Sequence, residues 1–362
     1  MKLSRMLVIL LTMILLLAIM VGSVPAQDAE TLPLGEHGPY GVGWRRVTYV
    51  DESRGNRRLE TIIWYPAVIP EGATVGILGL QNAELDASGA PFPLIVYSHY
   101  RGGESRLTLD AGPHLASYGF VVASASHHDT DTALVNRPYD VLFLIDQLAA
   151  LTDDPLAGLV DTDHVGVTGF GLGANTALLI NGTQIDPASY EAACPDPPRS
   201  VSALDLCYYR YTAWDELVAY RAQFDTLNEG ELWPAITDAR IRAVVPVDPC
   251  YGPLFGERGL AGATVPTLII GLLDEDQCLY RRDAAFIYDH LGAEDRYLVT
   301  LMDVDHAEAM GATRALETFN HFATAFFGYY LQGREDYGDY LTADFVDQHE
   351  DLAWGPVEMQ GE

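Results

Sequence analysis

Lysine is almost absent from this chain. Lys2 is the only lysine among 362 residues, and 21 basic residues stand against 51 acidic ones, which gives a formal net charge of −30. A surface with this charge repels both polyphosphate backbones and anionic lipid headgroups. The composition therefore excludes nucleic acid as a natural partner.

Glycine and proline are also too few to indicate a low-complexity chain. The sequence has 33 glycines and 20 prolines, while 49% of its residues are hydrophobic. That apolar content is high enough to form a buried core, and disordered segments lack it. We expect one globular domain.

An apolar run at the N-terminus precedes that domain. Lys2 and Arg5 come before an apolar stretch over residues 6–21, and small side chains follow up to Ala26. This pattern predicts a signal peptide over residues 1–26, hence a secreted or extracytoplasmic protein (periplasmic or on the cell surface) with no stable membrane insertion after cleavage. The alternative is an uncleaved membrane anchor.

The four cysteines lack the paired C-x-x-C spacing of a zinc site. An even number of cysteines in an exported protein favours two disulfides, for which three pairings are possible. We favour Cys194–Cys207, which would close a loop, and Cys250–Cys278, because both follow strand-like runs expected to end at the same sheet edge.

Short apolar runs alternate with helical patterns along the chain. The alternation predicts an α/β fold in which helices cover both faces of a mostly parallel sheet. Ligands of such sheets bind at the carboxyl ends of the strands. The expected strands are 44–50, 59–65, 93–98, 120–125, 164–168, 241–247, 267–272 and 297–302, and the expected helices are 107–118, 139–151, 174–180, 282–291 and 313–331.

One long stretch interrupts this alternation. Residues from about 184 to 238 have no strand pattern and are rich in aromatic side chains, which is unusual for a simple connection. We expect a cap over the strand ends that shields a pocket; the alternative is an insertion that packs on the body and binds nothing. An acidic tail follows from about residue 333 to 362.

A glycine-rich turn follows the expected strand 164–168. Gly169, Gly171 and Gly173 lead directly into a helical pattern, as in the nucleophile elbow G-x-S-x-G. Gly171 stands where that motif has its serine. Glycine adopts positive φ at little cost, but it has no side chain to attack a carbonyl.

The same glycines also match the dinucleotide fingerprint G-x-G-x-x-A through Ala174. That fingerprint expects a second strand that ends in an acid about 20 residues later. The stretch 181–193 is polar and contains proline instead, so we expect no cofactor.

Several separate stretches carry a resemblance to a known family. From Leu34 onward the chain resembles the α/β-hydrolase superfamily, and within it the predicted dienelactone hydrolase and platelet-activating-factor acetylhydrolase-like group. The stretches are Gly-Pro-Tyr-Gly-Val-Gly at 38–43, Trp-Tyr-Pro-Ala at 64–67, Leu-Ile-Val-Tyr-Ser-His at 94–99, Leu-Ala-Ser-Tyr-Gly-Phe-Val-Val-Ala at 115–123, 238–245 and 265–271.

This resemblance implies a Ser-Asp-His triad in that chain order and ester hydrolysis through an acyl-enzyme. Asp274 fits the acid and His306 the base, because both follow expected strands. Gly171 occupies the degenerate nucleophile position. The resemblance further implies an oxyanion hole made of backbone N–H groups, at Leu172 and at Tyr100 or Arg101.

Two functions are compatible with these residues. In the first, the protein lacks serine-esterase turnover and retains a capped pocket for a small apolar ester-like or lipid-like ligand. In the second, Asp274 and His306 activate a water molecule that hydrolyses a carboxylic ester.

Metal binding is a weaker alternative. His127, His128, Asp129 and Asp131 cluster in the sequence, but no helical or strand spacing places them on one face. The acids at 274–276 could attract calcium after export, but a solvated charge cluster is the usual explanation of such a run. We therefore expect no metal site at either cluster.

Overall fold

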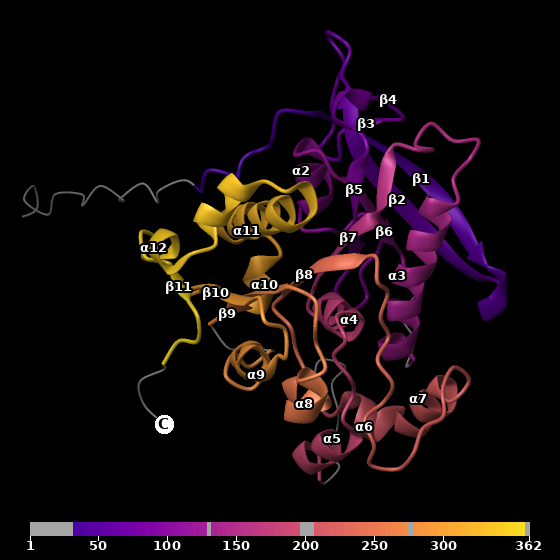
Figure 1. Ribbon diagram of the computed structural model, residues 1–362, viewed down its shortest axis with the longest axis vertical. Helices are drawn as coiled ribbons and strands as arrows, with labels where there is room; N and C mark the ends of the chain where they lie inside the picture. The colour runs from indigo at the N-terminus through magenta and orange to yellow at the C-terminus, as the bar shows by residue number, and fades with distance from the viewer. Residues whose placement is uncertain (1–31, 129–131, 196–205, 274–277, 359–362) are drawn as a thin grey trace, which may run out of the picture. The chain divides into compact units, whose positions relative to one another are not determined.

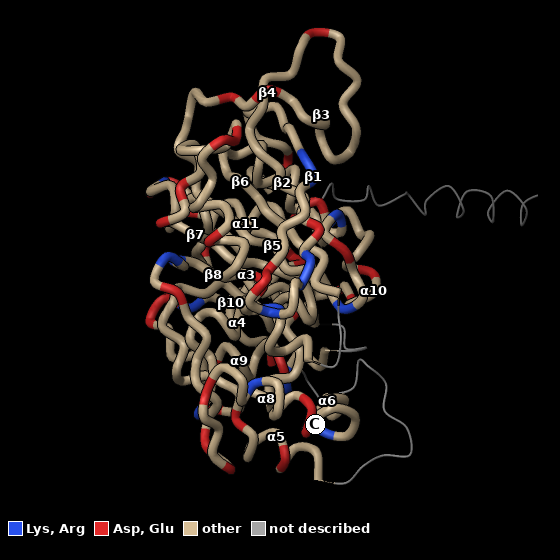
Figure 2. The backbone as a smooth tube through the Cα atoms, turned by 90° about the vertical axis from the view of Figure 1, so that its right-hand side faces the viewer, with Lys and Arg blue, Asp and Glu red and all other residues tan. Residues whose placement is uncertain are grey.

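The computed structural model describes residues 32–128, 132–195, 206–273 and 278–358. The signal peptide predicted for residues 1–26 lies outside these ranges. Within them, no helix combines the length and the apolar character needed to cross a membrane. Figure 2 shows aspartates and glutamates spread along the described chain, with fewer arginines between them.

One mixed sheet forms the centre of the molecule (Figure 1). Its order is β11-β10-β9-β8-β7-β5-β6-β2-β1-β3, and β4 pairs with β2. Neighbours from β10 to β6 are parallel, whereas β2 joins β6, and β11 joins β10, in the antiparallel direction. The strands are β1 (Gly41–Asp51), β2 (Arg57–Val68), β3 (Leu80–Gln81), β4 (Glu84–Leu85), β5 (Phe92–Ser98), β6 (Val121–Ala125), β7 (Val160–Phe170), β8 (Ile241–Val247), β9 (Thr267–Leu272), β10 (Arg296–Leu301) and β11 (Leu352–Trp354).

Helices cover both faces of this sheet because its strands are apolar on both sides. In β2, Ile62 and Trp64 pack in one core cluster, and Ile63 and Tyr65 pack in another. One face carries α2 (Ala111–Ser117) and α11 (Thr313–Gln332), and the other carries α3 (Ala133–Ala149), α4 (Leu172–Ile180) and α9 (Ala284–His290). The predicted fold class is confirmed.

The aromatic stretch between α4 and β8 forms three short helices, α5 (Pro187–Ala193), α6 (Tyr208–Thr212) and α7 (Trp214–Arg221). They lie beside α8 (Gly252–Leu260) and one end of α3 (Figure 1). A disulfide joins Cys194 to Cys207 within this insertion, which is the favoured pairing. Buried side chains of the insertion share a core cluster with Leu172 at the start of α4.

The acidic tail belongs to the folded body over most of its length. It contains the 3-10 helix η3 (Glu335–Tyr340), the helix α12 (Ala343–Val346) and strand β11. Tyr337, Leu341 and Val346 pack in the same core cluster as α11. The remaining short elements are η1 (Glu52–Arg54), η2 (Ala87–Gly89) and α10 (His306–Ala309).

Candidate functional site

The glycine-rich turn between β7 and α4 has the geometry that the sequence predicts. Gly171 connects the two elements with φ 57° and ψ −113°, a conformation that L-residues rarely adopt. A Cβ on Gly169 would lie 2.3 Å from the Ser98 carbonyl oxygen, and a Cβ on Gly173 would lie 1.9 Å from it. Both flanking positions therefore require glycine, because the end of β5 passes against the turn.

Alanine at position 173 should consequently destabilise the fold. We expect Gly173→Ala to lower the free energy of unfolding by about 3 kcal/mol, since its methyl group can be accommodated only by moving the backbone at Ser98. Urea denaturation of the two proteins measures the difference. Gly311→Ala is the matched control, because a Cβ there has no neighbour within 4 Å and should change stability little. Equal losses in both variants would contradict the close approach.

Gly171 differs from its flanking glycines in what its missing side chain would contact. A Cβ at this position would lie 3.1 Å from Cε1 and 3.5 Å from Nε2 of His306. His306 is the first residue of α10, just after β10, and is only 9% exposed. Its ring stacks on Phe170 with the centroids 4.5 Å apart. The imidazole predicted as base therefore faces the position where a nucleophile would begin.

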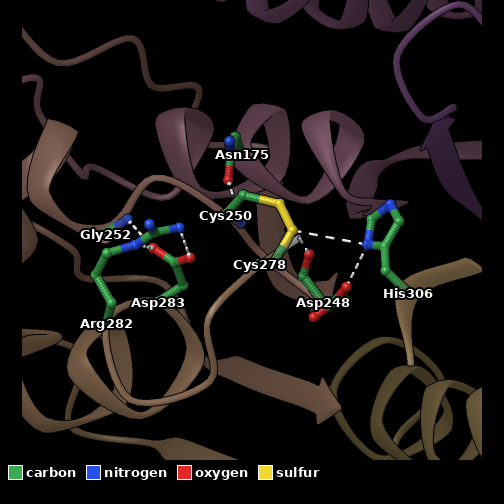
Figure 3. The surroundings of a disulfide bond; sticks show 8 residues. All are labelled: Asn175, Asp248, Cys250, Gly252, Cys278, Arg282, Asp283 and His306. Atoms are coloured by element: carbon green, nitrogen blue, oxygen red, sulfur yellow. Dashed lines mark hydrogen bonds and ion pairs between the residues drawn. A yellow bond between two sulfur atoms is a disulfide. The ribbon is translucent and has the colours of Figure 1, made fainter. Parts of the chain in front are cut away.

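Among the residues that the structure describes, Asp248 is an acid in direct contact with His306. Its Oδ2 lies 2.5 Å from Nδ1 of His306 (Figure 3), and its backbone N–H donates to the Ile270 carbonyl at 2.7 Å. The side chain of Asp248 is buried directly after β8. A buried carboxylate on Nδ1 fixes the orientation of the ring and leaves Nε2 directed at Gly171.

Asp248 is not among the site residues that the sequence predicts. Asp274, the predicted acid, lies outside the described residues, so the structure does not place it. Both aspartates follow expected strands, 241–247 and 267–272. A position just after a strand therefore does not tell one from the other in the sequence. Asp248 is the carboxylate that the structure brings to His306.

A disulfide lies directly beside this pair. It joins Cys250 to Cys278, again the favoured pairing, and the Cys278 Sγ is 3.6 Å from Nδ1 of His306 (Figure 3). The Cys250 N–H donates to Oδ1 of Asn175 on α4 at 3.1 Å. Because Cys250 is two residues beyond Asp248, these links restrain the segment that carries the acid.

The predicted site residues meet around one pocket of about 230 Å³. Five of them line it, and the remaining walls come from the segments after β8 and β9 and from the end of α10. The lining residues are Tyr100, Arg101, Gly171, Leu172, Cys250, Tyr251, Cys278, His306 and Met310. Sulfur, aromatic and aliphatic atoms dominate these walls, and Arg101 and His306 are the ionisable groups besides the tyrosines.

Arg101 links the pocket to the helical insertion. Its guanidinium donates to the Tyr209 hydroxyl and lies 5.0 Å and 5.1 Å from the ring centroids of Tyr208 and Tyr209. Burial would lower its pKa, but Tyr209 and Tyr251 more than offset this and raise the pKa of Arg101. A positive charge therefore persists at the pocket wall.

The start of α4 supplies a backbone donor to the same pocket. Leu172 is the first helical residue, so its N–H has no acceptor within the helix. Donors at a helix N-terminus also carry the positive end of the helix dipole. Leu172 thus offers a backbone donor next to Gly171, and its role in an oxyanion hole stays a prediction.

Apart from the pocket, the protein has a fully buried Ser-His-Asp cluster. Ser98 Oγ is 3.0 Å from Nε2 of His127, and Nδ1 of His127 is 2.9 Å from Oδ2 of Asp140. Asp140 also accepts from Arg54 and Arg57 at 2.7 to 2.8 Å. Since Ser98, His127 and Asp140 are at most 1% exposed, no substrate reaches them. This network fixes the end of β5, next to Tyr100.

The same network contains His127, which stands in the sequence beside other potential metal ligands. Both of its ring nitrogens are engaged, by Ser98 and by Asp140. Asp129 and Asp131 lie outside the described residues. At the pocket, Cys250, Cys278 and His306 place three potential ligand atoms within 4.8 Å of one another, but the disulfide already engages both sulfurs.

Comparison with known proteins supports the fold. The chain matches the model of platelet-activating factor acetylhydrolase, isoform II, over residues 73–140, which include β5, Tyr100 and Arg101. No curated protein matches the chain. With the sheet order, this match shows a fold of the α/β-hydrolase, esterase type, similar over these residues to platelet-activating factor acetylhydrolase.

Proposed function

We propose that this protein binds an ester-like or lipid-like ligand in its pocket and lacks the turnover of a serine esterase. The observation that carries the proposal is Gly171, at the turn where esterases of this fold hold the nucleophile. Without a hydroxyl at this position no acyl-enzyme can form. Loss of the serine from such a triad lowers turnover by several orders of magnitude.

The pocket walls suit a ligand with a carbonyl group and an apolar substituent. Leu172 offers a backbone donor and Arg101 a positive charge, while Met310 and the Cys250–Cys278 disulfide provide apolar surface. The helical insertion reaches this site through Tyr209, which supports its proposed role as a cap. Two disulfides and the apolar N-terminal run support action outside the cytoplasm.

A second candidate function is ester hydrolysis by an activated water molecule. The 2.5 Å contact between Asp248 and His306 favours it, because that contact keeps Nε2 directed at the space beside Gly171. In this reaction His306 Nε2 takes a proton from water, and the hydroxide attacks the ester carbonyl. The Leu172 N–H stabilises the oxyanion, and the imidazolium then returns the proton to the departing alkoxide.

An assay with p-nitrophenyl acetate separates the two functions. We expect the purified protein to release p-nitrophenolate no faster than its His306→Ala variant does. His164→Ala is the matched control, because His164 is exposed. Among the ion pairs of the described residues, it pairs only with Asp161. Turnover that is lost in His306→Ala but kept in His164→Ala would reject the binding-only function and support the water mechanism.

A further inference from the structure

The segment just before β1 is held firmly against α2 and α11. The Leu34 N–H donates to Nδ1 of His321 at 3.0 Å, and the Gly38 N–H donates to Oγ of Ser117 at 2.7 Å. The Tyr118 hydroxyl donates to the Glu36 carbonyl at 2.9 Å. His37 lies between these anchored positions, so its backbone is held in place beside α2.

Besides His37, two potential metal ligands lie at the start of α2. Asp110 precedes the helix, and His114 follows one turn later, with its N–H donating to the Asp110 carbonyl at 3.1 Å. Side chains four residues apart share one helix face. Oδ2 of Asp110 is 3.9 Å from Nε2 of His37, and the ligand atoms of all three residues lie within 4.8 Å of one another.

His114 is the most informative of the three residues. Its side chain is fully buried, and neither ring nitrogen makes a well-formed hydrogen bond among the described residues, although the Leu34 backbone lies close to the ring. A buried polar group without a partner is rare in native proteins and destabilises the fold. A neutral imidazole at this position offers a lone pair to a ligand.

We propose that His37, Asp110 and His114 form a binding site for a divalent transition-metal ion, with zinc as the best match. Two imidazoles and one carboxylate are ligands that Zn²⁺ takes in proteins, whereas Ca²⁺ and Mg²⁺ prefer oxygen alone. Ligand atoms around tetrahedral zinc lie about 3.4 Å apart. Because the side chains of His37 and Asp110 are 54% and 40% exposed, small rotations can close their 3.9 Å separation.

The surroundings of the site support this assignment. Asn320 Nδ2 lies 3.5 Å from Oδ2 of Asp110, as an outer partner that orients a ligating carboxylate. The exposed side chains leave the fourth coordination position to water. None of the three residues lines the pocket near His306, so the site is separate from the proposed function.

Metal binding at this site would join the segment before β1 to α2. A ligand that binds only the folded state raises the apparent stability by mass action. The metal-free protein should therefore unfold at a lower temperature than the zinc-loaded protein.

Titration of the full-length protein tests the site. The protein is purified with a tag that contains no histidine, stripped with EDTA, and titrated with ZnCl₂ by calorimetry and with CoCl₂ by absorption spectroscopy. We expect one equivalent of each metal to bind, visible cobalt bands of a four-coordinate site, and a higher melting temperature with zinc. His37→Gln and Asp110→Asn should each weaken zinc binding at least about tenfold.

Two controls keep the result specific. His164→Gln removes an exposed histidine that pairs with Asp161. Among the described residues this pair belongs to no group of three potential metal ligands, so the variant should bind zinc like the wild type. His114→Phe should abolish zinc binding while the metal-free variant melts no lower than the metal-free wild type, because an apolar ring replaces a buried polar one. Absence of one-equivalent binding, or unchanged binding in His37→Gln and Asp110→Asn, would overturn the proposal.

Discussion

Gly171→Ser is expected to raise kcat/KM for p-nitrophenyl acetate by at least about 10³-fold over the wild-type protein, since removing the serine of such a triad costs even more than that. The backbone at residue 171 already has the φ 57° and ψ −113° of the strained turn, and the new Cβ, 3.1 Å from Cε1 of His306, requires the imidazole to shift by a few tenths of an ångström. The same Cβ would lie 3.5 Å from Nε2 of His306, which places the hydroxyl within reach of the base.

The expected gain depends on the hydroxyl and not on the volume of the new side chain. Gly171→Ala is therefore the matched control: it introduces the same strain at positive φ, about 1 kcal/mol, but offers no nucleophile. A burst of p-nitrophenolate equal to the enzyme concentration would reveal the acyl-enzyme. An inactive Gly171→Ser variant that melts like the wild type would contradict the proposed arrangement of base and elbow.

The Gly171→Ser variant also allows the acid to be identified. Combined with Asp248→Asn, it should lose most of its activity, because the amide cannot hold the imidazole in the tautomer that accepts the serine proton. Combined with Asp274→Asn, it should keep that activity. The opposite outcome would assign the acid to Asp274, the residue that the sequence predicts.

The sheet was predictable because its strands are strongly apolar and separated by turn residues. The expected strand 267–272 coincides with β9, and the expected helix 313–331 with α11 (Thr313–Gln332). By contrast, α8 contains three glycines and a proline, and its Gly256 departs from helical geometry, so its helical pattern is weak. Strand β11 has only three residues in an acidic tail, and its pairing with β10 stabilises it.

The site was predictable only in part. The glycine-rich elbow motif after a strand indicated Gly171, and the Ser-Asp-His order implied by the family resemblance indicated His306. The acid was not distinguishable, because strand ends at Val247 and Leu272 are both followed by aspartates, and only the folded path of the chain brings Asp248 to the imidazole. Both disulfides were predicted from the same strand-end argument and from loop closure.

The buried network of Asp140 was not predictable, because its members come from separate elements. Ser98 ends β5, His127 follows β6, and Asp140 belongs to α3, while Arg57 begins β2. Nothing in the local sequence distinguishes this aspartate from an acid on an exposed helix face. Asp140 is important because its side chain is inaccessible to solvent. Its negative charge must therefore be compensated by the groups that contact it.

Asp140→Asn is expected to lower the free energy of unfolding at pH 7 by about 3 kcal/mol, because it removes the buried negative charge that both Arg54 and Arg57 contact. Of its ion pairs among the described residues, Arg54 then keeps only the one with Asp51. Urea denaturation measures this loss. Asp161→Asn is the control: Asp161 pairs with the exposed His164, and an exposed pair contributes less than about 1 kcal/mol.

The loss caused by Asp140→Asn should also depend on pH. Burial alone would raise the pKa of Asp140, but hydrogen bonds from Arg57 and His127 more than offset it and lower that pKa to about 2. A carboxyl group whose pKa is lower in the folded state stabilises the fold above its unfolded pKa, about 3.9, and this contribution disappears as the pH falls towards 2. The difference between wild type and Asp140→Asn should therefore be constant above about pH 5 and shrink between pH 4 and pH 2. A difference that stays the same at pH 3 and pH 7 would mean that the charge of Asp140 does not stabilise the fold, and that the variant acts through packing alone.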